Sequence, residues 1–290
     1  MKMDGQEESQ NVEDVRGSSG GFRPIHGISL GAVAVALIGG WVFGVNPLQI
    51  LGLLSGGDSQ VAQTSPGQPA QSPPADDAQA HFVSQVLRST ETVWTQAFQE
   101  RGRTYVDPKL VLFRDQYPTA CGTGEAAAGP FYCGEDRKVY LDLGFFDVMS
   151  RQLGAPGQFA HAYVIGHEVG HHVQNLLGIL ERVNAQRERS SETQSNALSV
   201  RLELQADCLA GVWATRSQKE QGWRLEPGDI AAALNAASQI GDDTLERRGR
   251  GVVVPDSFTH GTSAQRVAWL RRGVDSGQID ACDTFAADRL

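Results

Sequence analysis

The stretch AYVIGHEVGHHVQNLL, at positions 162–177, concentrates histidines in a chain that has seven of them. On a helix, His167 and His171 lie about 40° apart after one full turn, so their rings converge on one point. Convergent imidazoles are good zinc ligands. Glu168 is displaced by about 100° and suits a general base acting on a metal-held water better than a ligand. The stretch therefore predicts a metal-binding helix with an adjacent catalytic carboxylate.

A catalytic zinc site needs a third protein ligand. The extension HExxHxxGxxH is excluded, because Gln174 and Leu177 occupy its glycine and third histidine positions. The segment ELQAD instead places Glu203 and Asp207 on one face of a second helix, among apolar neighbours. Buried carboxylates need partners. We expect Glu203 to be the third ligand and Asp207 to accept a hydrogen bond from the far nitrogen of a ligand histidine; solvated helix charges are the alternative.

Two further histidines flank this pattern. His172 follows His171 directly and points about 100° away, which is typical of a surface or packing histidine. His161 lies two turns before Glu168 on a similar face, so it could line a cleft, although a solvent role is favoured.

The composition is that of a globular protein, with 290 residues of which 40% are hydrophobic and 20% charged. The net charge of −9 argues against a nucleic-acid partner, which would require a basic surface. A phosphate-binding glycine loop followed by Lys-Ser or Lys-Thr is absent from the sequence, so nucleotide chemistry has no support.

The first eighty residues differ from the rest of the chain. Residues 1–24 are polar and predict a disordered tail. Residues 28–45 carry no charge, and a helix of that length spans about 27 Å, enough to cross a bilayer. We predict one transmembrane helix in an anchor region over 25–54; a cleaved signal peptide and a buried soluble helix are the alternatives. Residues 55–80 are rich in Ser, Gly, Gln and Pro and predict a flexible linker before a globular domain at 81–290.

Basic residues predict the orientation of this anchor. Lys2, Arg16 and Arg23 precede it, whereas the next basic residue is Arg88. Positive-inside reasoning places the N-terminus in the cytosol and the globular domain in the periplasm or outside the cell, as a single-pass membrane protein.

Four cysteines follow the anchor, and an even number in an exported domain suggests two disulfides. Three pairings are possible. We favour Cys121 with Cys133, which closes a short glycine-rich loop, and this leaves Cys208 with Cys282. A thiolate metal site is the alternative, but the CxxC spacing of zinc ribbons is absent from the sequence.

Hydrophobic periodicity predicts an α+β domain that is mostly helical with a small sheet. Strands are expected over 109–113 and 137–143, and a polar connection over 181–194. Helices are expected over 81–102, 144–154, 156–180, 193–218 and 229–240, and around 267–272.

Six segments resemble, in order, those of the bacterial putative neutral zinc metallopeptidase family, and together they cover most of 81–290. They are GPFYC (129–133), VYLDLGFF (139–146), HEVGHHVQ (167–174), ELQADCLAGVWA (203–214), LNAASQIGDD (234–243) and SFTHGTSAQRVAWLRRG (257–273). The N-terminal anchor is also similar to that family's layout. The ELQAD element resembles CAAX-type membrane zinc proteases too, but those have several spans.

The resemblance implies a zincin-like fold in which His167, His171 and Glu203 hold one catalytic Zn²⁺ and Glu168 is the catalyst. It also implies that His260 steadies the oxyanion; a simple loop histidine is the alternative. We expect Arg266 to anchor that loop to a carboxylate. The strand VYLDL (139–143) is expected to offer an edge to an extended peptide.

Two functions follow from these features. The first is a membrane-anchored zinc endopeptidase that hydrolyses a peptide or protein substrate. The second is a catalytically silent, zinc-stabilised envelope scaffold or binding module. The presence of Glu168 favours the first, because a purely structural zinc site needs no base beside an open position.

Overall fold

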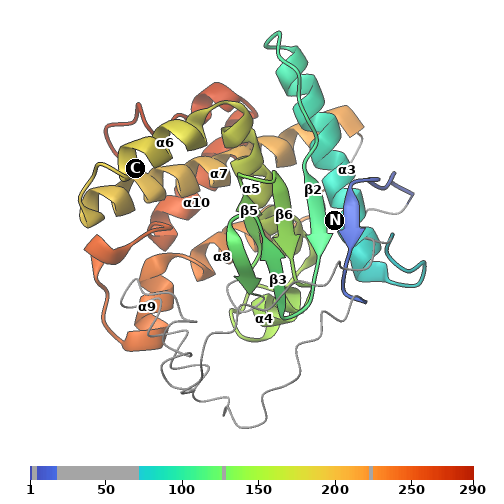
Figure 1. The fold of residues 1–290 in the computed structure, drawn as a ribbon, viewed down its shortest axis with the longest axis horizontal. Coiled ribbons are helices and arrows are strands. Elements are labelled where there is room, and N and C mark those ends of the chain that lie inside the picture. Colours follow the sequence, from blue (N-terminus) through green and yellow to red (C-terminus); the bar gives the residue numbers. More distant parts are fainter. Residues whose placement is uncertain (2–4, 18–71, 126–128, 222–224) are drawn as a thin grey trace. The chain divides into compact units, whose positions relative to one another are not determined.

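The computed structural model describes residues 1, 5–17, 72–125, 129–221 and 225–290 (Figure 1). Within it, Met1–Arg16 and Ala70–Leu290 form one compact unit. The predicted anchor over 25–54 and most of the predicted linker lie outside the described residues. None of the helices in the described part of the chain combines the length and apolar character that a membrane crossing requires.

A four-stranded sheet has the strand order β1-β2-β6-β5. β1 pairs with β2 and β2 with β6 in parallel, whereas β5 pairs with β6 in the antiparallel sense. A separate hairpin is formed by β3 and β4. The strands are β1 (Val12–Asp14), β2 (Lys109–Leu112), β3 (Gln116–Thr119), β4 (Gly122–Glu125), β5 (Phe131–Cys133) and β6 (Lys138–Leu141).

The two strands predicted from the sequence are confirmed as β2 and β6, but the predicted peptide-binding edge is wrong. β6 contains most of VYLDL and lies between β2 and β5, so both of its edges are already paired. Among the described strands, β1 and β5 are the outer ones.

The prediction of a disordered tail over 1–24 is wrong for residues 7–16, which we call the N-terminal segment. This segment contains β1, and its Val12 and Val15 side chains are buried. Its composition is polar, but a strand at a sheet edge is held by backbone pairing with its neighbour. The ordered domain therefore includes residues that precede the predicted anchor.

The helices are α3 (Ala78–Gln99), α4 (Gly144–Arg151), α5 (Gln158–Leu176), α6 (Ile179–Arg187), α7 (Glu192–Gln221), α8 (Asp229–Gln239), α9 (Asp242–Arg250) and α10 (Ser263–Ser276), with short 3₁₀ turns η2 (Pro255–Ser257) and η3 (Ile279–Cys282). Sequence periodicity predicted most of them. Gly178, with φ 72°, separates α5 from α6, so the helix expected over 156–180 is two helices and part of the polar connection is helical. α10 begins earlier than expected because Thr262 and Gln265 form a capping box.

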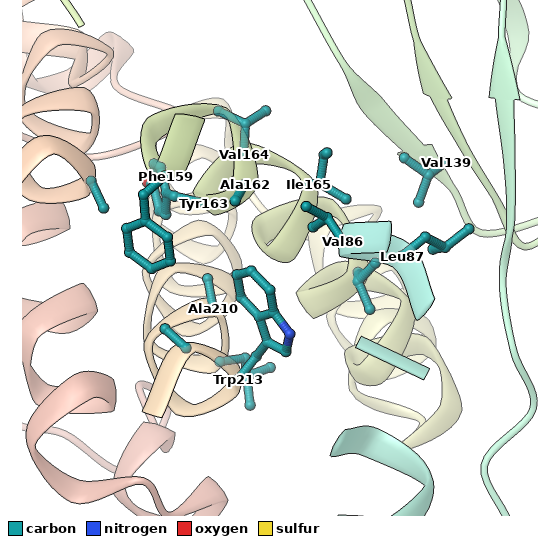
Figure 2. Packing of buried hydrophobic residues seen from close by; sticks show 14 of the residues in the cluster. Val86, Leu87, Val139, Phe159, Ala162, Tyr163, Val164, Ile165, Ala210 and Trp213 are labelled. Carbon is teal, nitrogen blue, oxygen red and sulfur yellow. The ribbon is translucent and has the colours of Figure 1, made fainter. Parts of the chain in front are cut away.

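The core is built around α5, which packs against α7, α8 and α3. Figure 2 shows Trp213 of α7 between Phe159 of α5 and the side chains that α3 contributes. The Phe159 and Trp213 rings stack with centroids 6.3 Å apart, and the indole N–H of Trp213 donates to Ser89 Oγ at 3.0 Å. This packing fixes the relative positions of α5 and α7, the two helices that carry the predicted ligands.

Both predicted disulfides are confirmed. Cys121 is bonded to Cys133, and Cys208 to Cys282, which leaves no free cysteine. The second bond joins α7 to η3, near the end of the chain.

Candidate metal centre

His167 and His171 of α5 face Glu203 of α7. The Nε2 atom of His167 lies 3.2 Å from Glu203 Oε2, and that of His171 lies 3.4 Å from Oε1. One ligand atom from each of the three residues can be chosen so that all lie within 4.8 Å of one another. The two histidine side chains, one helical turn apart, thus converge on a carboxylate that lies thirty-odd positions further along the chain.

Gly170, between the two histidines, allows α5 and α7 to approach closely. A Cβ atom at this position would lie 3.0 Å from the carbonyl oxygen of Ala206 and 3.3 Å from its Cβ. These distances are tighter than ordinary packing contacts, so any larger residue would push the helices apart. Gly170 in HEVGH is therefore needed for the close packing of α5 on α7, which the ligand spacing alone does not reveal.

The donor atoms suit a small divalent ion. Tetrahedral zinc with ligands at about 2.0–2.2 Å places donor atoms roughly 3.3 Å apart, close to the two His–Glu distances here. The Nδ1 atoms are engaged elsewhere, with Asp207 Oδ1 at 2.8 Å from His167 and Gln174 Oε1 at 2.8 Å from His171. Both Nε2 atoms are thereby directed at Glu203. Two imidazoles and one carboxylate match the three-ligand set of a catalytic zinc site.

Asp207 organises a fully buried polar network behind His167. Its Oδ1 atom accepts from Tyr163 Oη at 2.6 Å and from Arg266 Nη2 at 2.9 Å, and Oδ2 accepts from Arg266 Nε at 2.9 Å. Burial favours the neutral carboxyl, but Arg266 and His167 outweigh it and lower the pKa of Asp207 to about 2. The contacts expected of Asp207 and Arg266 are both present, and Tyr163 is an addition that the sequence did not predict.

Glu168 is almost completely buried, with 7% of its surface exposed. Burial raises the pKa of its carboxyl group, and the neighbouring His167 and His171 only partly oppose this. A raised pKa makes a carboxylate a stronger proton acceptor, as a general base requires.

His260 lies in the loop before α10 and is held by Asp242, a residue that sequence reasoning missed. Asp242 Oδ2 accepts from the backbone N–H of His260 at 2.6 Å and of Gly261 at 2.9 Å, and Oδ1 lies 3.1 Å from His260 Nδ1. Burial alone would lower the pKa of His260, but the carboxylates of Asp242 and Glu203 raise it. The charge of Glu203 therefore acts on His260 as well as on the two ligand histidines. In the sequence, Asp242 lies within the segment LNAASQIGDD (234–243) that resembles the family, but no role was assigned to it.

The two remaining histidines on α5 lie outside this centre. His172 is fully buried, with Nδ1 2.9 Å from Tyr132 Oη and Nε2 2.7 Å from the Val106 carbonyl oxygen, which agrees with a packing role. His161 stacks on Phe146 with ring centroids 4.2 Å apart. The predicted solvent role for His161 holds only in part, because Phe146 covers one face of a ring that is half-buried.

A helix that presents HExxH to a glutamate on a second helix defines a class of metal-dependent hydrolase. The chain belongs to a family described as putative neutral zinc metallopeptidase, whose profile matches residues 1–285. This membership indicates a metal-dependent peptidase with a zinc cofactor, and the His–His–Glu cluster fits that ion.

The chain is also similar to curated bacterial proteins. It is 47% identical over 293 aligned positions to a protein of Escherichia coli K12 named "Uncharacterized protein YpfJ", covering 98% of this chain and 99% of that one. It is 45% identical over 195 positions to "Uncharacterized protein Rv2575" of Mycobacterium tuberculosis H37Rv, covering 64% and 65%. "Uncharacterized protein Mb2605" of Mycobacterium bovis matches to the same extent. The search of solved structures gave no match.

Proposed function

We propose that the protein is a zinc-dependent endopeptidase with a zincin-like active site. One observation carries the proposal: Glu168 lies on α5 directly beside two imidazoles that converge with Glu203 from α7. A structural zinc site is normally closed by four protein ligands, whereas three ligands and a buried base suit catalysis.

The chain's own residues provide the following chemistry. His167, His171 and Glu203 hold the ion, which when bound acidifies water and polarises a carbonyl group. Glu168 accepts a proton from the water that attacks the peptide carbonyl and later delivers it to the leaving amine. His260, oriented by Asp242, donates a hydrogen bond to the oxygen on which negative charge develops. Asp207 and Arg266 keep His167 in its ligand orientation.

An extended peptide is the substrate class that the sheet favours. β5 is an outer strand among the described residues, and it is linked to α5 because Asn175 donates to Tyr132 Oη at 2.9 Å and to the Gly134 carbonyl at 3.1 Å. A peptide that adds to this strand would run beside the helix that carries the histidines. β5 therefore replaces the strand over 139–143 as the proposed peptide-binding edge.

The two disulfides support a place of action in an oxidising compartment, the periplasm or the cell exterior. Attachment to a membrane through residues 25–54 stays a prediction, since these residues lie outside the described part of the chain.

The proposal is tested with Glu168→Gln, which keeps the shape of the side chain but removes the base. We expect zinc content equal to that of the parent and a loss of about 100- to 10,000-fold in cleavage of a quenched peptide library. Glu181→Gln, at an exposed position on α6, is the matched control and should cleave normally. A Glu168→Gln protein that binds zinc and cleaves as fast as the parent would rule out the catalytic role.

A further inference from the structure

The N-terminal segment is part of the same sheet as the strands that adjoin the metal centre. β1 runs parallel to β2 with Val12 opposite Leu110. The Leu110 N–H donates to the Asn11 carbonyl oxygen at 2.9 Å, and the Val15 N–H donates to the Leu112 carbonyl oxygen at 2.9 Å. Hydrogen bonds at both ends of β1 therefore fix its register.

A buried carboxylate in α3 is satisfied by this segment. Ser9 Oγ donates to Glu91 Oε1 at 2.5 Å, and Asn11 Nδ2 donates to the same oxygen at 2.9 Å. Glu91 is 3% exposed, and Arg88 reaches its other oxygen at 3.5 Å. A buried carboxylate is costly without hydrogen-bond donors. The N-terminal segment supplies two donors to Glu91, so undocking this segment would leave that carboxylate poorly satisfied.

Charges on the two sides of this contact are complementary. Glu13 lies 3.0 Å from Lys109 Nζ and 2.7 Å from Lys138 Nζ, on β2 and β6. Arg16 lies 2.7 Å from Asp77, the residue that caps α3. Each partly exposed pair contributes little by itself, but together they favour one docking position.

From these contacts we infer that the N-terminal segment and the metal centre lie in the same compartment, on one side of any membrane that holds the protein. Strand pairing joins atoms 2.9 Å apart, whereas the hydrocarbon core of a bilayer is about 30 Å thick. The sequence predicted a cytosolic N-terminus and an exported domain. These two placements are incompatible with a sheet in which β1 pairs with β2.

The inference is independent of the proposed function, because it concerns β1 and not the metal. Its test uses two matched probes in the full chain, Gln10→Cys in the N-terminal segment and Gln152→Cys just after α4. Both glutamines are exposed, and the parent has no free cysteine, so background labelling is low. Bacterial spheroplasts expressing each variant are treated with a membrane-impermeant maleimide, either intact or after lysis.

We expect the ratio of labelling in intact to lysed spheroplasts to agree for the two variants within about twofold, as exposed sites on one side of a barrier require. The inference would be overturned if Gln152→Cys were labelled in intact spheroplasts and Gln10→Cys were labelled only after lysis. Labelling of both variants only after lysis would support it and would place the whole domain in the cytosol. Such a result would contradict the exported placement but would leave the proposed peptidase chemistry untouched.

A second measurement tests the docking itself. In the detergent-solubilised full chain, the amides of Leu110 and Val15 should exchange hydrogen at least about 100-fold more slowly than in an unstructured peptide. Exchange of both amides at the unstructured rate would show that the N-terminal segment is free, and the inference would then fail.

Discussion

Two faces of α5 carry neighbouring histidines whose partners differ in charge. One face directs His167 and His171 at the carboxylates of α7, whereas the other directs His172 at a tyrosine hydroxyl and a backbone carbonyl. His167 and His172 are both buried, so exposure does not distinguish these two. The difference lies in the charge of the partners.

The pKa values express this difference. Burial disfavours the charged form of every imidazole, but Asp207 and Glu203 outweigh it at His167 and raise its pKa to about 10. At His172 burial prevails and lowers the pKa to about 4. An environment that stabilises a proton on an imidazole also stabilises a metal cation nearby. Carboxylates on the facing helix, more than the histidines themselves, make one face of α5 a candidate metal centre.

Removing the charge of Glu203 should reduce the difference between the two faces of α5 more than any other single change. Glu203→Gln keeps the size of the side chain but leaves both Nε2 atoms without an anionic partner. Structural zinc sites gain about 10–16 kcal/mol from four ligands, so the loss of one corresponds to about 3 kcal/mol, or roughly 100- to 200-fold in zinc affinity. Competition with a chromogenic zinc chelator measures this change. His172→Gln is the control on the opposite face; equal affinities for the two variants would contradict the assignment.

Arg266 should have a smaller effect because it acts through Asp207. Arg266→Gln removes the bidentate partner of that carboxylate, and we expect zinc affinity to fall by about 10- to 100-fold. Arg266→Lys keeps the charge without the planar fork and should fall between that variant and the parent.

The same chelator assay applies, with far-ultraviolet circular dichroism to confirm folding. The exposed Arg271 on the same helix provides the control Arg271→Gln. If both Arg266 variants bound zinc like the parent, Asp207 would not need its arginine partner.

The smallest expected effect concerns the non-metal face. Folded protein keeps His172 neutral down to about pH 4, whereas the unfolded chain takes up a proton below the ordinary pKa of 6.5. The stabilising contribution is therefore complete above pH 6.5 and is lost as the pH falls toward 4. Between pH 7.5 and pH 5.5 the free energy of unfolding should fall by about 1 kcal/mol more in the parent than in His172→Gln. Denaturant titrations at the two pH values measure the difference, and an identical pH response would refute it.

Local periodicity revealed much of the metal centre. The spacing of His167 and His171, and of Glu203 and Asp207, is a property of single helices, so it can be deduced without knowing how the chain folds. The pairing of Asp242 with His260 could not be deduced, because it depends on how α9 and the loop before α10 meet. Tyr163 was missed for the same reason, since its hydroxyl group is satisfied only by the packing of α7.

The N-terminal segment shows the limit of composition as a guide. Its residues are polar, and by themselves they do not bury enough surface to order a chain. Order comes from the edge of β2 and from Glu91, both far along the sequence. Helices α5, α7, α8 and α10, by contrast, followed closely from hydrophobic spacing, because helices satisfy their backbone locally. The short, polar helices α6 and α9 were missed.

The bond between Cys208 and Cys282 closes a covalent ring over a sequence separation of 74 residues, which contains His260 and Arg266. Asp207 immediately precedes the first cysteine of this ring. Closing a loop of that size restricts the unfolded chain by about 4 kcal/mol. Thiol reductants would release this restraint without touching a single ligand atom. The stability of the fold around the candidate site is therefore coupled to the redox state of its surroundings and is greatest where this disulfide stays oxidised.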